Sequence, residues 1–447
     1  MTGKPLFQRI ADRKVSVGII GLGYVGIPVS LSFTEAGFRV RGFDIDEFRI
    51  DELLSGRSYI DDVSDTRIRA ALENGFKPSA NPSVIADCDV YVLAVPTGIN
   101  EGEPDMAAVE AATKTVAEQA GSRETLVVVT STVYPGATRN IVKPSIEPAA
   151  EGPTYFAMVP ERLNPGGDLE FSKIPLVVGA DSEVAGAVAT ELFETVVSRT
   201  YPVESTDTAE LAKTLENTYR MVNIALVNEL VTFSQYIDAD VWEAIDAAAT
   251  KPFGFQPFRP GPGVGGHCIP IDPQFLTWRA ENLGIELSLL NGAQRVNDRM
   301  PRLVANRIES LLRENHCEPE DASIFALGAA YKPNVGDTRN SPALQVIEAL
   351  PDEAEVTIAD PHADACDVSR KLVQTPDPEN VRSADIVVLL VDHKTFDLKS
   401  IGEQASLIFD TRNAMPDDIS AEVVTLGEIP ERSCNETTRN FSLTEVP

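Results

Sequence analysis

The N-terminal part of the chain alternates between short apolar runs and polar turns in an order that predicts strand, turn, helix and strand. Apolar residues fill 15–20, a glycine turn follows at 21–26, an apolar stretch continues to about Ala36, and FRVRGFDID predicts a second strand ending near Asp44. Apolar runs that end in polar loops recur in DCDVYVLAVPT, TLVVVTSTVYPG, TYFAMVPERLNPGG and PLVVGA. This repetition predicts an open parallel sheet whose carboxyl ends present loop residues to a crevice.

From Asp207 the pattern changes to helical spacing. The segment DTAELAKTLENTYRMVNIALVNELVTFSQYID has one apolar face, marked by Leu211, Leu215, Val222, Leu226 and Leu230. A second helical pattern, ELSLLNGAQRVNDRMPRLVANRIESLLREN, follows a loop rich in glycine and proline. From about Ala322 the strand pattern returns, and AEVTIADP predicts a strand that ends at Asp360. The predicted domains are 1–205, 206–318 and 319–430, followed by a polar tail at 431–447.

The glycine turn carries a nucleotide-binding pattern. Gly21-x-Gly23-x-x-Gly26 follows a strand and opens a helix, and Asp44 stands 23 residues after Gly21 at a strand end. Such glycines let backbone N–H groups approach a pyrophosphate, while Asp44 can bind the adenosine ribose. The carboxylate would repel a 2′-phosphate, which favours NAD over NADP, although Arg49 could accept that phosphate. The alternative is a turn that serves only close packing.

The two α/β regions together predict the fold class. We expect two Rossmann-type parallel-sheet domains joined by a central helical connector. The second α/β region lacks the glycine pattern, so we expect it to hold a different nucleotide rather than a second dinucleotide. Polar residues at strand ends, such as Thr97, Thr132 and Glu161, become candidate site residues.

Composition narrows the possible partners. The chain has 447 residues, of which 68 are acidic and 38 basic, giving a formal net charge of −30 that disfavours nucleic acid as a partner. Such a surface predicts adaptation to high salt, where carboxylate repulsion is screened; an ordinary acidic protein is the alternative. No membrane span or signal peptide is recognisable, so we expect a cytoplasmic protein with no membrane partner. Five scattered cysteines and four histidines indicate neither a disulfide framework nor a metal site.

One cysteine is in an environment unsuited to packing. Cys268 lies in RPGPGVGGHCIPIDPQFL, with Asp272 four residues later, whereas a packing thiol is usually found among aliphatic side chains. A thiolate on such a loop can act as a nucleophile. The neighbouring His267 suggests a Cys/His hydrolase, but adjacent side chains usually point apart. Asp272, which precedes Pro273, could instead cap a turn or a helix.

Six motifs together resemble a known family. GLGYVG, STVYPG, PERLNPG, AELAKTLENTYRMVNIALVNE, GPGVGGHCIPIDP and YKPNVGDTRNSP occur in the order seen in nucleotide-sugar 6-dehydrogenases of the UDP-glucose/GDP-mannose dehydrogenase family. The cysteine loop with TKPFGF before it is most similar to enzymes acting on UDP-N-acetylglucosamine. UDP-glucose enzymes usually have lysine where this chain has Ile271, and the N-acetylmannosamine branch has His-Pro-Arg where this chain has KPF. N-acetylglucosamine, N-acetylmannosamine, N-acetylgalactosamine and glucose all stay open as the sugar.

The resemblance implies a two-step oxidation of a sugar C6 alcohol to a carboxylate with NAD. An aldehyde carbon has no second hydride to give until it gains a fourth substituent, which the Cys268 thiolate would supply as a thiohemiacetal that becomes a thioester. Lys213 and Asn217, four residues apart on one helix face, would stabilise the oxyanion. Asp272 and Glu161 would handle protons and the hydrolytic water, and the sequence does not apportion these roles.

The resemblance also implies the remaining binding residues and partners. The expected cofactor site comprises Gly21, Gly23, Tyr24, Val25, Gly26, Asp44, Arg49, Thr97, Thr132 and Arg339. The expected UDP-sugar site comprises Arg162, Leu163, Lys213, Asn217, Arg220, Gly265, Tyr331 and Lys332. A homodimer or higher homo-oligomer through the central helix and a role in surface polysaccharide biosynthesis are also implied. Two other classes stay open: a cysteine hydrolase with structural NAD, and a nucleotide-sugar sensor without catalysis.

Overall fold

The computed structural model describes residues 4–60, 62–86, 88–162, 170–237, 239–363 and 369–428. Leu163, expected at the sugar site, and the tail at 431–447 lie outside these residues. Contacts divide the chain into two units, with 1–222 and 266–294 in unit 1 and 223–265 and 295–447 in unit 2. The domain boundaries expected from the sequence stay predictions. Within the described ranges, no helix is long and apolar enough to cross a bilayer.

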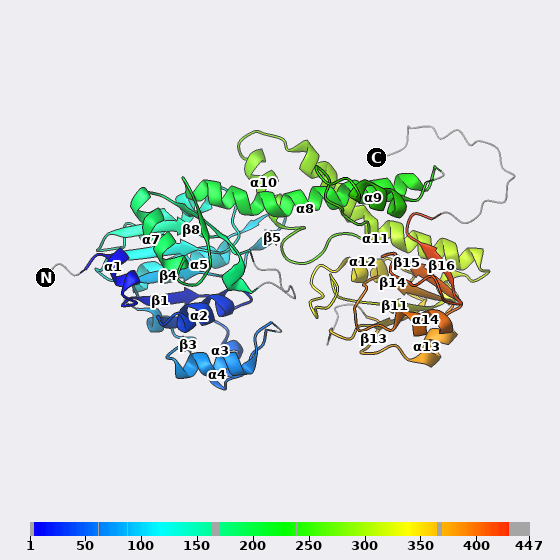
Figure 1. Cartoon of the computed structure of the whole chain (residues 1–447), viewed down its shortest axis with the longest axis horizontal. Helices are drawn as coiled ribbons and strands as arrows, with labels where there is room; N and C mark the ends of the chain where they lie inside the picture. Colours follow the sequence, from blue (N-terminus) through cyan, green and yellow to red (C-terminus); the bar gives the residue numbers. More distant parts are fainter. Residues whose placement is uncertain are drawn as a thin grey trace. The chain divides into compact units, whose positions relative to one another are not determined.

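Unit 1 is built on an eight-stranded sheet, drawn from blue to green in Figure 1. Its order is β10-β9-β8-β7-β4-β1-β2-β3. The strands are β1 (Ser16–Ile20), β2 (Arg39–Phe43), β3 (Lys77–Ser79), β4 (Val90–Leu93), β7 (Thr125–Val129), β8 (Thr154–Met158), β9 (Leu176–Ala180) and β10 (Thr200–Val203). The expected parallel sheet is confirmed except that β8 and β9 pair antiparallel. Every residue of β4 and β7 is buried, as expected where helices cover both faces.

The helices of unit 1 begin where side chains satisfy free backbone N–H groups. Asp46 accepts hydrogen bonds from the first turn of α3, and Ser182 does the same for α7. The helices are α1 (Leu6–Ala11), α2 (Gly26–Glu35), α3 (Glu47–Leu54), α4 (Asp65–Glu73), α5 (Ala107–Gln119), α6 (Lys143–Ile146) and α7 (Glu183–Phe193). Short helical turns occur at η1 (Pro82–Ile85), η2 (Thr138–Val142) and η3 (Phe171–Lys173), and a hairpin is formed by β5 (Gly98–Asn100) and β6 (Glu103–Asp105).

Unit 2 contains a second sheet, in which every pair of neighbouring strands is parallel. Its order is β13-β12-β11-β14-β15-β16. The strands are β11 (Ser323–Leu327), β12 (Glu355–Ala359), β13 (Lys371–Val373), β14 (Ile386–Leu389), β15 (Leu407–Asp410) and β16 (Glu422–Thr425). They are accompanied by η4 (Pro319–Asp321), α12 (Pro342–Glu348), α13 (Pro378–Ser383) and α14 (Leu398–Gln404). The second Rossmann-type domain is therefore confirmed. Pro342 is the first residue of α12, a position where its missing N–H costs no helical hydrogen bond.

The central part of the chain is helical, as the sequence predicts. It contains α8 (Thr206–Ser234), α9 (Val241–Ala249), α10 (Asp272–Glu281) and α11 (Ser288–Glu314). In unit 2, the Trp242 indole N–H of α9 donates to the Leu426 carbonyl at 2.9 Å, which ties α9 to the end of the second sheet. The apolar positions predicted on α8 include Leu211, Leu215, Leu226 and Leu230, all of which are exposed.

Candidate active site

A polar cluster in unit 1 joins α8 to the first residue of α10 and to the cysteine loop before it. The Asn217 amide on α8 donates to Asp272 Oδ2 at 2.5 Å. The backbone N–H of Asp272 in turn donates to the Cys268 carbonyl at 2.8 Å, so the four-residue spacing of the two residues is one helical turn. Lys213 and Asp272 are buried, whereas Cys268 is exposed. The structure thus brings together four residues expected at the catalytic site.

Asp272 does not cap a helix. It is the first residue of α10, and no side chain makes a capping hydrogen bond there. Its carboxylate binds Asn217 instead, so the capping alternative is wrong for this side chain. Pro273 follows at a position where its missing N–H costs no helical hydrogen bond.

Glu161, the fifth expected catalytic residue, is electrostatically coupled to this cluster. Burial raises the pKa of Glu161 to about 7, against the effect of Lys213 and with a further rise from Asp272. Burial also raises the pKa of Asp272 to about 6, opposed by Lys213 and the Asn217 hydrogen bond. Glu161 Oε1 is buried and has no hydrogen-bond partner among the described residues. Two carboxyl groups that change protonation near neutral pH are suited to proton transfer.

The Lys213 ammonium remains charged within this cluster. Burial lowers the pKa of Lys213, but the nearby Glu161, Asp272 and Cys268 raise it above its ordinary value. A fixed cation beside an exposed thiol stabilises the thiolate and any negative charge that develops on a bound oxygen.

The glycine turn leaves a backbone cradle after β1. Gly21 has a φ of 91°, and a Cβ on Gly26 would lie 1.8 Å from the Gly21 carbonyl oxygen. At Gly23 a Cβ would meet only Arg49 Nη1, at 3.9 Å. Side chains at the outer glycines would disrupt the turn, and the turn is open at its middle. These features fit a dinucleotide pyrophosphate at the N-terminus of α2, where Tyr24 and Val25 also lie.

Asp44 lies next to this cradle. Its Oδ2 accepts a hydrogen bond from Leu22 N at 2.7 Å. Arg49 Nη1 is 3.3 Å from the same oxygen, and Arg49 also pairs with Asp46. Two carboxylates therefore neutralise the arginine that could have favoured NADP.

The two threonines expected at the cofactor lie on neighbouring loops. Thr97 Oγ1 donates to the Thr132 carbonyl at 2.7 Å. Sequence reasoning missed Glu210, which is fully buried and accepts hydrogen bonds from Gly136 N at 2.5 Å and Thr138 N at 2.8 Å. Glu210 precedes Lys213 by about one turn, so it ties the Thr132 loop to the helix that carries Lys213 and Asn217. The motif AELAK contained this residue, but its partners lie far away in sequence.

The other residues expected to bind the sugar are divided between the two units. In unit 1, Arg162 forms an ion pair with Glu216 at 2.6 Å, and Arg220 lies on α8. In unit 2, a Cβ on Gly265 would lie 2.5 Å from the Asn340 carbonyl oxygen and 3.0 Å from Tyr331 Cβ. The loop that carries Tyr331 and Lys332 therefore packs closely on this glycine.

Unit 2 also contains a cation that sequence reasoning missed. Arg412 follows β15, and its Nε donates to the Leu390 carbonyl at 2.7 Å. A Cβ on Gly261 would lie 2.7 Å from Arg412 Nη1. Burial lowers the pKa of Arg412, while Asp392 and Asp410 act to raise it.

Arg339, expected at NAD, forms an ion pair with Asp337 at 2.6 Å.

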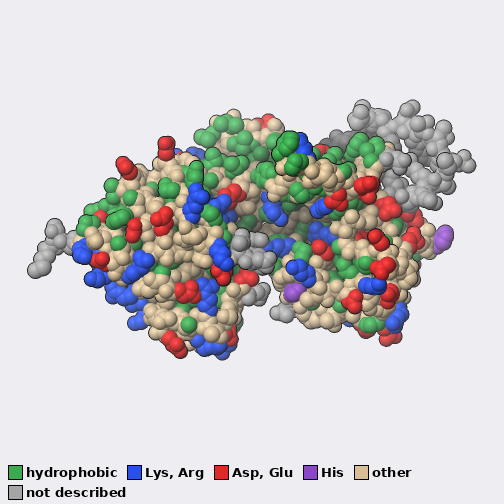
Figure 2. Space-filling view, in the orientation of Figure 1, with side chains coloured by type: hydrophobic (Ala, Val, Ile, Leu, Met, Phe, Trp, Pro, Cys, Tyr) green, Lys and Arg blue, Asp and Glu red, His purple; other side chains and the backbone are tan. Residues whose placement is uncertain are grey.

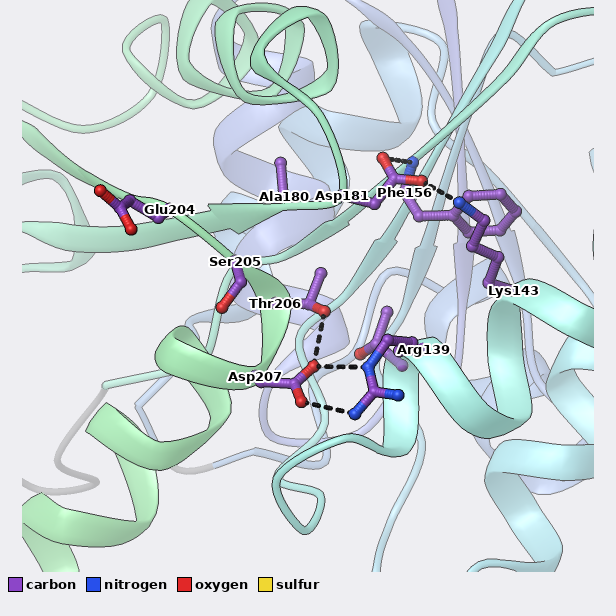
Figure 3. Close-up of a pocket in the computed structure, with 10 residues that line it drawn as sticks. Arg139, Lys143, Phe156, Ala180, Asp181, Glu204, Ser205, Thr206 and Asp207 are labelled. Atoms are coloured by element: carbon purple, nitrogen blue, oxygen red, sulfur yellow. Dashed lines mark hydrogen bonds and ion pairs between the residues drawn. The ribbon is translucent and has the colours of Figure 1, made fainter.

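A separate cavity of about 370 Å³ lies at the start of α8 (Figure 3). Its two cations are paired, Arg139 with Asp207 at 2.8 Å and Lys143 with Asp181 at 2.7 Å. None of the residues expected at the cofactor or sugar site lines it. Across the part of the chain that the structure describes, no group of three or more metal-binding side chains is placed to hold a metal ion.

Three models of the UDP-glucose/GDP-mannose dehydrogenase family match the chain in succession. The NAD binding domain matches residues 15–197, the central domain 207–299 and the UDP binding domain 325–417. The cofactor motif, the cysteine loop and the Tyr331 loop each fall within the corresponding match.

Individual relatives carry different substrate names. The chain is 34% identical to a UDP-N-acetyl-D-mannosamine dehydrogenase of Pyrococcus horikoshii over 89% of this chain and 95% of the relative. It is 33% identical to a UDP-N-acetyl-D-glucosamine 6-dehydrogenase of Salmonella typhi over 90% and 97%. A solved structure of the Pyrococcus horikoshii UDP-D-ManNAc dehydrogenase matches with a TM-score of 0.82 and 31% identity, covering 92% of this chain and 99% of that one.

Proposed function

Because the chain belongs to the UDP-glucose/GDP-mannose dehydrogenase family, we propose that it oxidises the C6 alcohol of a UDP-sugar to a carboxylate in two NAD-dependent steps. The observation that carries this proposal is the cluster of Lys213, Asn217 and Asp272 beside the exposed Cys268 loop. A thiol hydrolase can also use a cation and carboxyl groups, so the glycine cradle and the family membership are what favour oxidation over hydrolysis.

The glycine cradle and Asp44 would hold NAD, with Thr97 and Thr132 on adjacent loops. When bound, NAD⁺ supplies the hydride acceptor for both oxidations. Asp44 would bind the adenosine ribose hydroxyls, and the N–H groups of the turn would face the pyrophosphate.

Cys268 provides the covalent step. Its thiolate sulfur bonds to the C6 aldehyde carbon, and the carbonyl oxygen becomes an alkoxide that takes up a proton. The resulting thiohemiacetal carbon has a hydride to lose, and its oxidation leaves a thioester. Water then adds to the thioester carbon, the carbon–sulfur bond breaks, and the carboxylate is released with the thiolate restored.

The residues around the thiol handle charge and protons. Lys213 and Asn217 stabilise the oxyanion at each stage. Asp272 and Glu161 accept the alcohol proton and orient the hydrolytic water, because their raised pKa values let both change protonation near neutral pH.

UDP-N-acetylglucosamine is the proposed substrate, because the segment KPF replaces the His-Pro-Arg expected of the N-acetylmannosamine branch. UDP-N-acetylmannosamine is the second candidate, favoured by the names of several relatives. Tyr331, Lys332 and Gly265 in unit 2 would contact the nucleotide or sugar, with Arg412 available to a phosphate. Arg162 and Arg220 complete the proposed set, and the product would supply a surface polysaccharide.

The exposed face of α8 would join two or more copies of the chain. Leu215, Leu226 and Phe233 are 58%, 54% and 54% exposed, and they share one stripe with Leu211, Tyr219 and Leu230. A continuous apolar stripe of this length is typical of an interface. Leu226→Glu should shift the chain to a smaller species in light scattering coupled to size exclusion, while an exposed charge change such as Glu229→Gln should not.

The experiment that tests the proposed activity is a panel of UDP-sugars with NAD⁺ at high salt. Absorbance at 340 nm should rise to two NADH per sugar, and mass spectrometry should show the uronic acid. UDP-N-acetylglucosamine should have the highest kcat/KM. Release of product without NADH would support the hydrolase alternative and overturn the proposal.

A further inference from the structure

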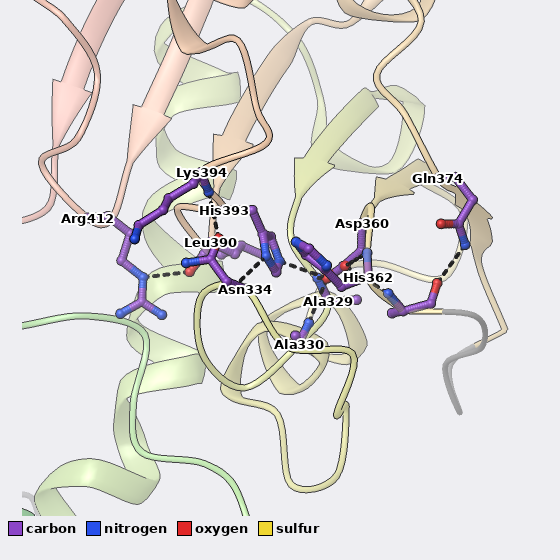
Figure 4. Close-up of polar contacts among 11 residues, drawn as sticks. Ala329, Ala330, Asn334, Asp360, His362, Gln374, Leu390, His393, Lys394 and Arg412 are labelled. Carbon is purple, nitrogen blue, oxygen red and sulfur yellow. Dashed lines mark hydrogen bonds and ion pairs between the residues drawn. The ribbon is translucent and has the colours of Figure 1, made fainter. Parts of the chain in front are cut away.

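A buried hydrogen-bond network lies at the carboxyl edge of the second sheet (Figure 4). Asp360 follows β12 and is fully buried. Its Oδ2 accepts from Ala329 N at 2.8 Å and Ala330 N at 2.9 Å, and its Oδ1 accepts from His362 N at 2.9 Å and Ala363 N at 3.0 Å. Burial would raise the pKa of Asp360, but hydrogen bonds from His393 and the backbone N–H groups lower it below its usual range. Asp360 is therefore a carboxylate.

The network determines the tautomer of His393. Its Nε2 is 3.0 Å from Asp360 Oδ2, and its Nδ1 accepts a hydrogen bond from Asn334 N at 3.0 Å. A ring nitrogen that accepts an N–H bond carries no proton, so Nδ1 is bare and Nε2 donates to Asp360. The His393 ring also packs against His362, with centroids 4.9 Å apart, and against Phe396 at 5.3 Å.

Asn334 connects this network to the loop at 331–340. Its Oδ1 accepts from Lys394 N at 2.9 Å, so Asn334 makes two bonds to the 393–394 segment. The loop also closes on itself, because Tyr331 N donates to the Asp337 carbonyl at 3.0 Å. Gly336 packs where a Cβ would lie 2.4 Å from the His362 carbonyl oxygen. The segment that begins with Tyr331 and Lys332 is thus attached to the end of β14 through Asn334.

We propose that His393 is a positioning residue for UDP binding. Fixed by Asp360 with its proton on Nε2, it accepts the Asn334 amide and holds Tyr331 and Lys332 where they contact the nucleotide. This inference rests on the proposed role of those two residues. His393 does not touch the substrate, because its own side chain is completely buried.

A matched pair of variants separates the two bonds of His393. His393→Asn places an acceptor oxygen near the position of Nδ1 and removes the donor to Asp360, whereas His393→Gln keeps a donor near Nε2 and removes the acceptor for Asn334. Calorimetric titration with UDP should give a Kd about tenfold higher for His393→Gln and within about threefold of the parent for His393→Asn. The KM for the UDP-sugar should rise with kcat nearly unchanged, and the Kd for NAD⁺, which binds in unit 1, should stay constant in both.

Equal losses of UDP affinity in the two variants, or no loss in either, would overturn the positioning role. A parent chain that fails to bind UDP would instead overturn the proposed UDP site, and this inference with it. Should a His393 variant not fold, Asn334→Gly tests the attachment of the loop on which the role of His393 depends. Glycine keeps the backbone N–H that binds His393 and tolerates the φ of 61°, but it removes the second bond, to Lys394. UDP affinity should fall about threefold, and an unchanged Kd would show that UDP binding does not need the loop to be held through Asn334, which would contradict the proposal.

Discussion

The two Rossmann-type sheets place an aspartate at the same topological position and use it in opposite ways. Asp44 follows β2, the neighbour of β1, and Asp360 follows β12, the neighbour of β11. Asp44 is bound by Leu22 N, Asp46 N and Arg49 beside an open glycine turn. Asp360 is enclosed, with four backbone N–H donors and His393 around its carboxylate. The same position can hold a ligand in one sheet and the protein's own loop in the other.

The length of the following loop accounts for this difference. In unit 1, α2 begins at Gly26, directly against the carbonyl of Gly21. In unit 2, Gly328 has a similarly positive φ of 96°, but α12 does not begin until Pro342. The longer connection is the loop that His393 and Asn334 hold, and it occupies the place of a short pyrophosphate turn. The NAD-binding and UDP-binding roles of the two family domains thus have a local structural reason.

The largest expected effect comes from removing the Cys268 thiol, which tests whether the cysteine loop alone supplies the covalent chemistry. Cys268→Ala should lower uronic acid formation by roughly a thousandfold or more, because the aldehyde then has no covalent route to the second oxidation. NAD⁺ and UDP should still bind, since neither sheet is altered. Mass spectrometry of the parent should detect an adduct on the Cys268 peptide. Cys317→Ala is the matched control, and near-parental production of uronic acid by Cys268→Ala would show that the thiol is structural.

The comparison of the two aspartates is tested directly by equivalent substitutions. Asp44→Asn should raise the Kd for NAD⁺ about tenfold and lower the Tm less than Asp360→Asn does, because Asp44 accepts three hydrogen bonds from the protein and Asp360 accepts five. Asp360→Asn should lower the Tm by roughly 4–8 °C while the Kd for NAD⁺ stays constant, because a buried charged acceptor of five hydrogen bonds is lost. Calorimetry of both variants measures the two effects. A loss of NAD⁺ affinity in Asp360→Asn would break the comparison.

A smaller effect is expected from pH. Burial raises the pKa of Asp272 to about 6 and of Glu161 to about 7, so both carboxyl groups lose protons as the pH rises through this window. Because the ionised forms accept protons, kcat/KM should increase several-fold between about pH 5.5 and 7.5. Glu161→Gln should remove the upper part of this rise in initial-rate profiles. The affinity for UDP, a property of the second sheet, should not follow the same curve.

The stability of the folded chain should change in the opposite direction to kcat/KM over the same pH range. A carboxyl group whose folded pKa is raised binds more protons in the native state, so its contribution to stability falls as pH rises from its unfolded pKa to its folded pKa. For Glu161 that window runs from 4.5 to about 7. Thermal melts of Glu161→Gln should therefore show a weaker loss of stability across this window than melts of the parent.

The smallest expected effect is the response of the Tm to salt, in which the two units should not differ. Figure 2 shows acidic side chains on the visible faces of both units, in keeping with the net charge of −30. Screening of carboxylate repulsion should raise the Tm between low and molar KCl, and the two units should respond alike. A melting temperature that is flat across this range would remove the halophilic interpretation.

Local sequence patterns predicted the strands and helices, but they did not predict contacts between residues far apart in the sequence. Gly21, Gly26 and Asp44 were recognisable because a strand, a turn and a helix follow one another within one short segment. The hydrogen bond of Asn217 to Asp272 joins residues 55 positions apart, and only the family resemblance placed them together. The antiparallel pairing of β8 and β9 could not be inferred, because both strands have the uniformly apolar pattern of buried strands.

The residues missed in the sequence share one property, which is that each binds at least one backbone group far away in the sequence. Glu210 binds two N–H groups more than 70 positions away, and Arg412 binds the Leu390 carbonyl. His393 binds Asn334 N, 59 positions away. Almost every residue type has the same backbone N–H and carbonyl groups, so the sequence does not indicate which residue provides a backbone partner.

The discontinuity of unit 1 has a consequence for synthesis on the ribosome. Residues 266–294, which carry Cys268 and Asp272, return to a unit whose other part ends at 222. A nascent chain that has emerged only to residue 222 contains Lys213 and Asn217 without the carboxylate that binds Asn217. At translation rates of about 5–20 residues per second, the interval before Asp272 emerges lasts several seconds. The first sheet and its glycine turn can form in that time, so the proposed catalytic cluster is completed later than the proposed cofactor cradle.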